Sequence, residues 1–262
     1  MTGFGQRPSD PAARKPLQSA HPEQPSTLDE ELLGADIASV VSTETDETRI
    51  ERMSAELRAG FEAMHQVKRG VSILGSARTH PEHPDYRLAR ETSRLLGEAG
   101  FSIITGAGPG VMAAANRGAR DAGALSVGLR IDLPYEQNQN PWVDLVIDHH
   151  YFFVRKVMFV RYARAFVVLP GGFGTLDELF EVLTLIQTRK VRYFPVILMR
   201  HDYWKGLLDW LHDTALGEGK IGVQDTALVR VTDDPEEVVD IVAAAADLQG
   251  WEGDPRPQTD DS

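Results

Sequence analysis

Short apolar runs alternate along this chain with longer segments in which apolar residues recur every three to four positions. The runs predict strands at 71–74, 101–104, 125–129, 145–147, 165–169, 196–199 and 227–231. The longer segments predict helices at about 48–66, 86–99, 111–122, 151–163, 175–188, 203–215 and 234–246. Strands that alternate with helices form βαβ units around a parallel sheet that is buried on both faces. The pattern therefore predicts an α/β fold, a Rossmann-like doubly wound parallel sheet in a single domain.

The two ends of the chain lack this pattern. Residues 1–45 are rich in Pro, Ser, Thr, Asp and Glu, and their apolar residues occur only in short bursts such as Leu32-Leu33. Because such a segment buries too little surface to offset its chain entropy, we expect a disordered acidic arm at 1–45. The polar composition of 251–262 predicts a disordered tail in the same way. The folded domain is expected to cover 46–250.

Composition narrows the class of function. The 262 residues include no cysteine, which excludes disulfides, thiolate catalysis and cysteine-ligated metal centres. The formal net charge is −12, so the chain as a whole repels nucleic acid and anionic membranes. No apolar run approaches the roughly 20 residues of a membrane span, and the first residues hold no apolar signal-peptide region. We expect a cytoplasmic protein with no nucleic-acid or membrane partner.

A first glycine-rich loop, Thr105-Gly-Ala-Gly-Pro-Gly110, follows a predicted strand and opens a predicted helix. It differs from the dinucleotide fingerprint G-x-G-x-x-G because Val111 stands at the third glycine position. No acidic ribose partner follows about 20 residues later, so NAD binding is weakly supported. Two interpretations stay open. The glycines let a phosphate approach the amides at the helix N-terminus, or they only form a tight turn.

A second glycine-rich loop ends the strand predicted at 165–169 and begins the next helix. Three glycines without blocking side chains and one hydroxyl stand at this helix N-terminus: Gly171, Gly172, Gly174 and Thr175. Asp177 and Glu178 fall in what we expect to be the first helical turn, where a carboxylate also serves as a plain partner of the helix dipole. A carboxylate beside an anion-binding loop is electrostatically costly, however, and this favours a functional role for Glu178.

Four basic residues stand close together on the helix predicted before that strand: Arg155, Lys156, Arg161 and Arg164. Helical spacing spreads them over more than one face, so we expect one or two to be functional and the others to be solvated. Arg155 and Lys156 lie at the end where a substrate anion would sit, and arginine suits a bidentate phosphate contact. The pair His149-His150 lacks metal-ligand spacing, so local packing or hydrogen bonding is the better interpretation.

The segment Pro170-Gly-Gly-Phe-Gly-Thr-Leu-Asp-Glu178, with Arg155-Lys156-Val-Met158 before it, resembles the paired signature of the LOG ("lonely guy") family. Members are cytokinin riboside 5′-monophosphate phosphoribohydrolases, often mislabelled lysine decarboxylases. Residues 106–112, 133–137 and 153–156 also resemble the longer bacterial branch of this family, and the resemblance covers about 70–245. The chain departs from many relatives, which have Gly, Glu and Asn in these places, at Ala107, Ala113 and Arg130.

The resemblance implies hydrolysis of the N-glycosidic bond of a nucleoside 5′-monophosphate, such as AMP or a cytokinin riboside monophosphate, to free base and ribose 5-phosphate. Departure of the base leaves an oxocarbenium-like ribose, which needs a nearby negative charge and an activated water; one carboxylate can serve both needs. The resemblance implies that Arg155 and Glu178 are catalytic. It also implies a substrate and phosphate site formed by Gly108, Glu136, Lys156, Gly171, Gly172, Gly174, Thr175 and Thr184.

The resemblance calls for no metal and no organic cofactor. It implies a homodimer or hexamer in which a partner subunit helps complete the site. The alternative function is a nucleotide or molybdopterin-type carrier that binds a phosphate ligand without turning it over, for which an Arg155–Glu178 pair is unnecessary. A lysine decarboxylase is poorly supported, because Lys156 beside an arginine on a helix has no context for a Schiff base to pyridoxal phosphate.

Overall fold

A computed structural model describes residues 27–34, 44–132, 139–191 and 194–248. Its seven-stranded sheet has the order β4-β3-β2-β1-β5-β6-β7, and every pair of neighbouring strands is parallel. The strands are β1 (Gly70–Leu74), β2 (Ser102–Thr105), β3 (Ser126–Ile131), β4 (Leu145–His149), β5 (Ala163–Val168), β6 (Val196–Leu198) and β7 (Val229–Val231). Each overlaps a strand predicted from the sequence, and the prediction of a doubly wound parallel α/β sheet is confirmed.

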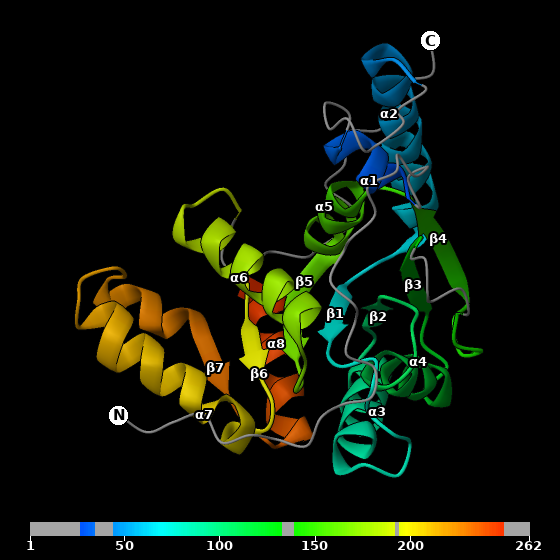
Figure 1. Ribbon diagram of the computed structural model, residues 1–262. Coiled ribbons are helices and arrows are strands. Elements are labelled where there is room, and N and C mark those ends of the chain that lie inside the picture. Colours follow the sequence, from blue (N-terminus) through cyan, green and yellow to red (C-terminus); the bar gives the residue numbers. More distant parts are fainter. Residues whose placement is uncertain (1–26, 35–43, 133–138, 192–193, 249–262) are drawn as a thin grey trace, which may run out of the picture.

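Helices cover both faces of this sheet (Figure 1). One face packs against α3 (Pro84–Glu98), α4 (Val111–Asp121) and α8 (Pro235–Leu248). The other packs against α5 (Phe152–Tyr162), α6 (Phe173–Gln187) and α7 (His201–Trp210). A π-helical turn at Leu211–Leu216 and a 3-10 turn at Val223–Leu228 lead from α7 to β7. No described helix is long and apolar enough to cross a bilayer.

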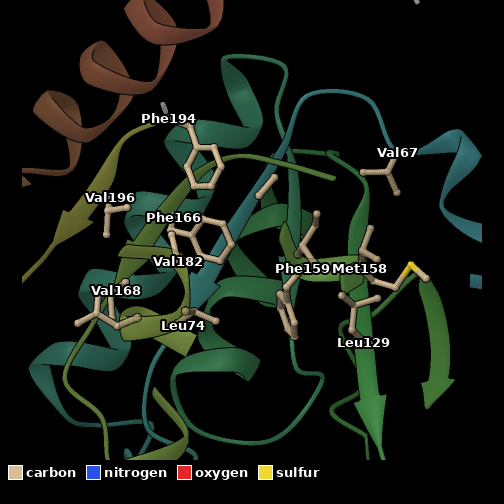
Figure 2. Packing of buried hydrophobic residues seen from close by; sticks show 14 of the residues in the cluster. Val67, Leu74, Leu129, Met158, Phe159, Phe166, Val168, Val182, Phe194 and Val196 are labelled. Carbon is tan, nitrogen blue, oxygen red and sulfur yellow. The ribbon is translucent and has the colours of Figure 1, made fainter. Parts of the chain in front are cut away.

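A continuous apolar core fixes α5 and α6 on the sheet (Figure 2). Met158 and Phe159 enter it from α5, and Val182 enters it from α6. Phe166 of β5 stacks on Phe194, with ring centroids 5.5 Å apart. Because such close-packed side chains leave little freedom for rigid-body shifts, the N-terminal ends of both helices have defined positions at the edge of the sheet.

The strand order reverses between β1 and β5, and the loops that follow these strands are joined there. The Ser76 N–H, after β1, donates to the Pro170 carbonyl after β5 at 3.0 Å. The Ser76 carbonyl accepts from the Val111 N–H at the start of α4, also at 3.0 Å. Gly110, with φ of 67°, allows this approach, since a Cβ there would lie 2.3 Å from the Ser76 oxygen. A doubly wound sheet binds its ligands at such a topological switch point.

The N-terminal part differs from its prediction where it is described. Residues 28–33 form a short helix, α1 (Leu28–Leu33), inside the segment expected to be disordered, and Thr27 caps it. Leu28 and Leu32 pack against the core, and Glu31 forms an ion pair with Arg49 at 3.3 Å. The two leucines are four residues apart, a helical spacing too short to stand out in a polar segment. Residues 1–26 and 35–43 and the tail at 251–262 lie outside the described residues.

After this segment, α2 (Asp46–Ala63) and a 3-10 turn (Met64–Gln66) match the helix predicted at 48–66. Helix α2 lies beside α5 in Figure 1. The two approach closely at Gly60, where a Cβ would lie 2.7 Å from the Met158 methyl group. The N-terminal helices are therefore attached to the helix that carries Arg155, Lys156 and Arg161. Arg164, predicted on the same helix, lies in β5 instead.

Candidate active site

A cavity of about 1150 Å³ opens at the switch point, beyond the carboxyl ends of β1, β2, β5 and β6. Seven of the residues predicted to form the site line it: Gly108, Arg155, Gly171, Gly172, Gly174, Thr175 and Glu178. They come from the loop before α4, from α5 and from the start of α6. The fold therefore brings together in one cavity two glycine-rich loops and the upstream arginine, which are separated in the sequence.

The second glycine loop leaves the N-terminus of α6 open. At Gly172 and Gly174, no atom of the described residues, apart from the adjoining residues and helix backbone, lies within 4 Å of the position that a Cβ would occupy. A Cβ at Gly171, in contrast, would lie 2.0 Å from the Thr175 Oγ1. In the described part of the chain, no side chain accepts a hydrogen bond from the N–H groups of residues 172–175. Gly171 is thus required by the folded loop itself, while Gly172 and Gly174 leave space that a ligand can occupy. Four orphan N–H groups at a helix start favour an anion.

Helix α6 begins at Phe173, two residues earlier than the sequence predicted. Its first turn contains no acidic residue, and Asp177 and Glu178 lie in the second turn. The expectation that these two carboxylates stand in the first turn is wrong. This weakens the interpretation of Glu178 as a plain dipole partner, because the effect of the dipole falls off beyond the first turn.

Glu178 is a buried carboxyl group. It is 7% exposed, and its Oε2 has no hydrogen-bond partner within the described part of the chain. Burial, opposed in part by the charges of Arg155 and Lys156, raises the pKa of Glu178 to about 7. A carboxyl group with this pKa can take up or release a proton near neutral pH, which is the property required of a general acid or base.

Arg155 belongs to α5, and its side chain extends toward the first glycine loop. Its Nε donates to the carbonyl of Leu129, inside β3, at 2.8 Å, and its guanidinium is 5.2 Å from the centroid of the Phe159 ring. A Cβ at Gly106 would lie 2.3 Å from its Nη2. Gly106 therefore makes room for this arginine, and the contacts hold the guanidinium in the cavity wall where its charge reaches Glu178.

The first glycine loop is held by buried polar side chains. The Asn140 Nδ2 donates to the carbonyls of Ala107 and Gly108, at 3.0 Å each, and to the Asn116 Oδ1 at 2.9 Å. Thr105 Oγ1 accepts from the Ala107 N–H at 3.0 Å. Ala107 has a φ of 62°, a conformation that costs a non-glycine residue on the order of 1–2 kcal/mol. The network stabilises this conformation, in which Gly108 faces the cavity.

Three of the predicted site residues lie elsewhere or are not described. Lys156 does not line the cavity; its Nζ pairs with Asp177 at 2.8 Å and Glu181 at 3.1 Å. Thr184 donates to the Phe180 carbonyl and lines a separate hollow on the outer side of α6. Glu136 lies outside the described residues.

Other side chains from the sequence prediction have local roles. The guanidinium of Arg161 lies over the Phe61 ring, and burial lowers the pKa of the partly buried Arg164. The two histidines are not directed at one common ligand. The His149 Nδ1 is 3.1 Å from the Arg130 carbonyl, while the His150 Nδ1 is 3.2 Å from Glu56 Oε2. The interpretation of this pair as local hydrogen bonding is confirmed.

Sequence reasoning missed several residues of the cavity wall. Arg78 lies in the loop after β1, and Arg200 and Tyr203 follow β6. Arg200 adopts a φ of 76° and pairs with the buried Asp85 at the start of α3. The signal that could have found them is their position, since each follows the carboxyl end of a strand in a parallel sheet within five residues, near the edge where ligands bind.

Fold and cavity together define a class: a doubly wound α/β protein whose glycine-rich helix N-terminus opens into a cavity that holds a buried carboxyl group and an arginine. Comparisons with known proteins narrow this class. The family described as "Possible lysine decarboxylase" matches residues 112–242, half of the chain. The chain belongs to this family, the LOG family.

Named relatives agree with this assignment. The chain is 34% identical over 139 residues to the cytokinin riboside 5′-monophosphate phosphoribohydrolase LOG of Oryza sativa subsp. japonica, a match of 51% of this chain and 55% of that protein. It is 32% identical over 143 residues to the cytokinin riboside 5′-monophosphate phosphoribohydrolase of Mycobacterium marinum, covering 53% of this chain and 75% of that protein. Among solved structures, the molybdenum cofactor binding protein of Rippkaea orientalis has the same fold. Its TM-score is 0.50 at 23% identity, over 68% of this chain and 98% of that one.

Proposed function

We propose that this protein hydrolyses the N-glycosidic bond of a nucleoside 5′-monophosphate to free base and ribose 5-phosphate. The observation that carries the proposal is Glu178, a buried carboxyl group with a pKa of about 7 in the same cavity as Arg155 and the open end of α6. A carrier needs to bind its ligand but has no use for a proton acceptor that is costly to bury. The names of the rice and mycobacterial relatives support the same reaction.

The proposed reaction uses Glu178 as general base. The bond between C1′ of the ribose and the nitrogen of the base breaks, and its electron pair leaves with the base. The oxygen of a water molecule forms the new bond to C1′, and the Glu178 carboxylate accepts a proton from that water. The same negative charge stabilises the oxocarbenium-like transition state. The base departs with a proton from solvent, so that charge and atoms balance.

The proposed phosphate site is the start of α6, with Gly108 on the opposite loop. Unpaired N–H groups and the helix dipole both favour an anion there. Binding a phosphate that does not react can be used to orient the ribose over Glu178. Arg155, close to both loops, is proposed to hold the ribose phosphate or the carboxylate in position.

Lysine decarboxylation, which the name of the matching family suggests, fits the site poorly. Burial disfavours the charge on Lys156, but its hydrogen bonds to Asp177 and Glu181 outweigh burial and raise its pKa. A lysine must lose its proton to form a Schiff base, so these two carboxylates oppose that chemistry.

A direct test incubates the purified protein with AMP and measures adenine and ribose 5-phosphate by chromatography, with adenosine as the matched substrate without phosphate. We expect adenine release from AMP and far slower release from adenosine, because the remote phosphate contributes binding energy. Tight AMP binding without adenine release would favour the carrier. Equal turnover of AMP and adenosine would contradict the phosphate site.

We also propose a homo-oligomer, as the family resemblance implies. Support comes from the outer side of α6, where Phe173 is 92% exposed and a hollow of about 580 Å³ is lined by Leu176, Phe180 and Thr184, among others. Such an exposed apolar surface is typical of an interface between subunits. Sedimentation of the wild-type chain and of Phe180→Ser tests this, since the variant should shift toward the monomer.

A further inference from the structure

Tyr203 makes a contact with the second glycine loop that the proposed reaction does not explain. Its hydroxyl donates to the Gly171 carbonyl at 2.6 Å, across 32 positions of sequence. The ring is held in place by Trp204, which is buried, and the two ring centroids are 4.9 Å apart in an edge-to-face arrangement. The Trp204 indole N–H in turn donates to the Met199 carbonyl at 2.9 Å. A rigid support therefore presents the Tyr203 hydroxyl to this loop.

The bonded carbonyl belongs to the peptide between Gly171 and Gly172. No described peptide bond is cis, so the C=O of Gly171 and the N–H of Gly172 point in opposite directions. No group in the described part of the chain accepts a hydrogen bond from this N–H. A peptide between two glycines rotates at little steric cost, because neither neighbour carries a Cβ. Without an anchor, both orientations of this peptide are accessible.

We propose that Tyr203 is a positioning residue that keeps the Gly171–Gly172 peptide in one orientation for an incoming phosphate. In the observed orientation the carbonyl is occupied by Tyr203, and the Gly172 N–H stays available at the N-terminus of α6. A rotated peptide would replace this donor by a carbonyl oxygen, which repels a phosphate. This inference rests on the proposed function in one respect: the ligand carries a phosphate group.

The test compares Tyr203→Phe with Tyr162→Phe. Both lose one hydroxyl that donates to a backbone carbonyl, but the Tyr162 hydroxyl contacts the Phe61 carbonyl and does not line the cavity. Calorimetry with ribose 5-phosphate and AMP measures binding, and steady-state kinetics with AMP and adenosine separate KM from kcat. For Tyr203→Phe we expect Kd for ribose 5-phosphate and KM for AMP to rise about five- to tenfold. The kcat for AMP, the rate with adenosine and the melting temperature should stay close to wild type, as should every value for Tyr162→Phe.

Unchanged ribose 5-phosphate affinity in Tyr203→Phe would overturn the proposal. An equal loss of adenosine turnover, or of kcat without a change in KM, would also overturn it, since either result indicates a general structural role. If the wild-type protein releases no adenine, the proposed hydrolysis fails, but the ribose 5-phosphate titration still decides the role of Tyr203.

Discussion

Helices α5 and α6 both begin beside the candidate site. They differ in whether side chains accept hydrogen bonds from the N–H groups at their N-termini. At α5, the Phe152 N–H donates to Asp29 Oδ2 at 3.1 Å, and the N–H groups of His150 and Tyr151 donate to Glu56 Oε1 at 3.1 and 3.4 Å. At α6, no side chain in the described part of the chain accepts a hydrogen bond from the N–H groups of residues 172–175, and Gly172 and Gly174 face open space. The protein thus supplies its own anions to one helix and leaves the other uncapped.

The difference assigns separate tasks to the two helices. Capping orders α5, which carries Arg155. Because the caps occupy N–H groups at the N-terminus of α5, these groups cannot bind an external anion. The uncapped α6 leaves its donors available for a ligand, and it carries Glu178 one turn further on. The caps of α5 come from α1 and α2, outside the residues 112–242 that match the family. The helix with the arginine is therefore stabilised by a part of the chain that this match does not include.

The largest effect is expected at Glu178. Glu178→Gln keeps the size of the side chain and removes both the negative charge and the proton acceptor. Turnover of AMP should fall by about a hundredfold or more, because the transition state loses its counter-charge and the water its base. AMP affinity should hold or improve, since a carboxylate repels a phosphate. Adenine release and calorimetry on the same preparations measure the two quantities.

Asp177→Asn is the matched control for this substitution. Asp177 is one residue away and also lines the cavity, but it is exposed and paired with Lys156. Because Lys156 retains Glu181 as a partner, turnover should change little. Near-normal turnover in Glu178→Gln, or loss of binding together with turnover, would contradict the assigned role.

Glu178→Gln should also stabilise the folded protein, by an amount that depends on pH. The folded pKa of Glu178, about 7, lies above the unfolded value near 4.5. Below pH 4.5 both states hold the proton, and no penalty exists. As pH rises to 7, the unfolded chain ionises first and the folded protein loses up to about 3 kcal/mol. Urea unfolding should show Glu178→Gln to be more stable than wild type at pH 8 and equal to it near pH 4. An equal difference at both pH values would argue against the raised pKa.

Smaller effects are expected at Gly174, where a substitution should raise the stability of the fold and lower the affinity for AMP. This residue lies inside the first turn of α6, and beyond the adjoining backbone a Cβ there would contact no atom of the described residues. Gly174→Ala should raise the free energy of unfolding by about 0.5–1 kcal/mol, because alanine is the better helix former. The added methyl group enters the proposed phosphate space, so AMP affinity should fall about tenfold. Higher stability with unchanged affinity would place the phosphate elsewhere.

The sequence predicts the N-terminal region of α6 far better than that of α5. The glycines, Thr175 and Glu178 stand within eight residues, so the strand, loop and helix that hold them follow from local pattern. The pattern predicts the start of α6 two residues too late, because Phe173 and Gly174 carry no helix-start signal. The Asp29 contact with the Phe152 N–H spans 123 positions, and the Tyr203 contact with Gly171 spans 32. Neither pair leaves a periodic signal, since each depends on how distant segments pack.

The smallest effect is expected at the caps of α5. Glu56→Ala removes the acceptor of two backbone N–H groups and the partner of His150, and its side chain is largely buried. The free energy of unfolding should fall by about 1 kcal/mol, a typical value for a lost cap, and thermal unfolding should detect it. Glu56→Gln keeps a carbonyl acceptor and should lose less. Ribose 5-phosphate affinity should not change in either variant, because neither Glu56 nor the two residues whose N–H groups it binds line the cavity. A loss of that affinity with unchanged stability would show that the α5 end belongs to the ligand site, and the contrast between the two helices would then be wrong.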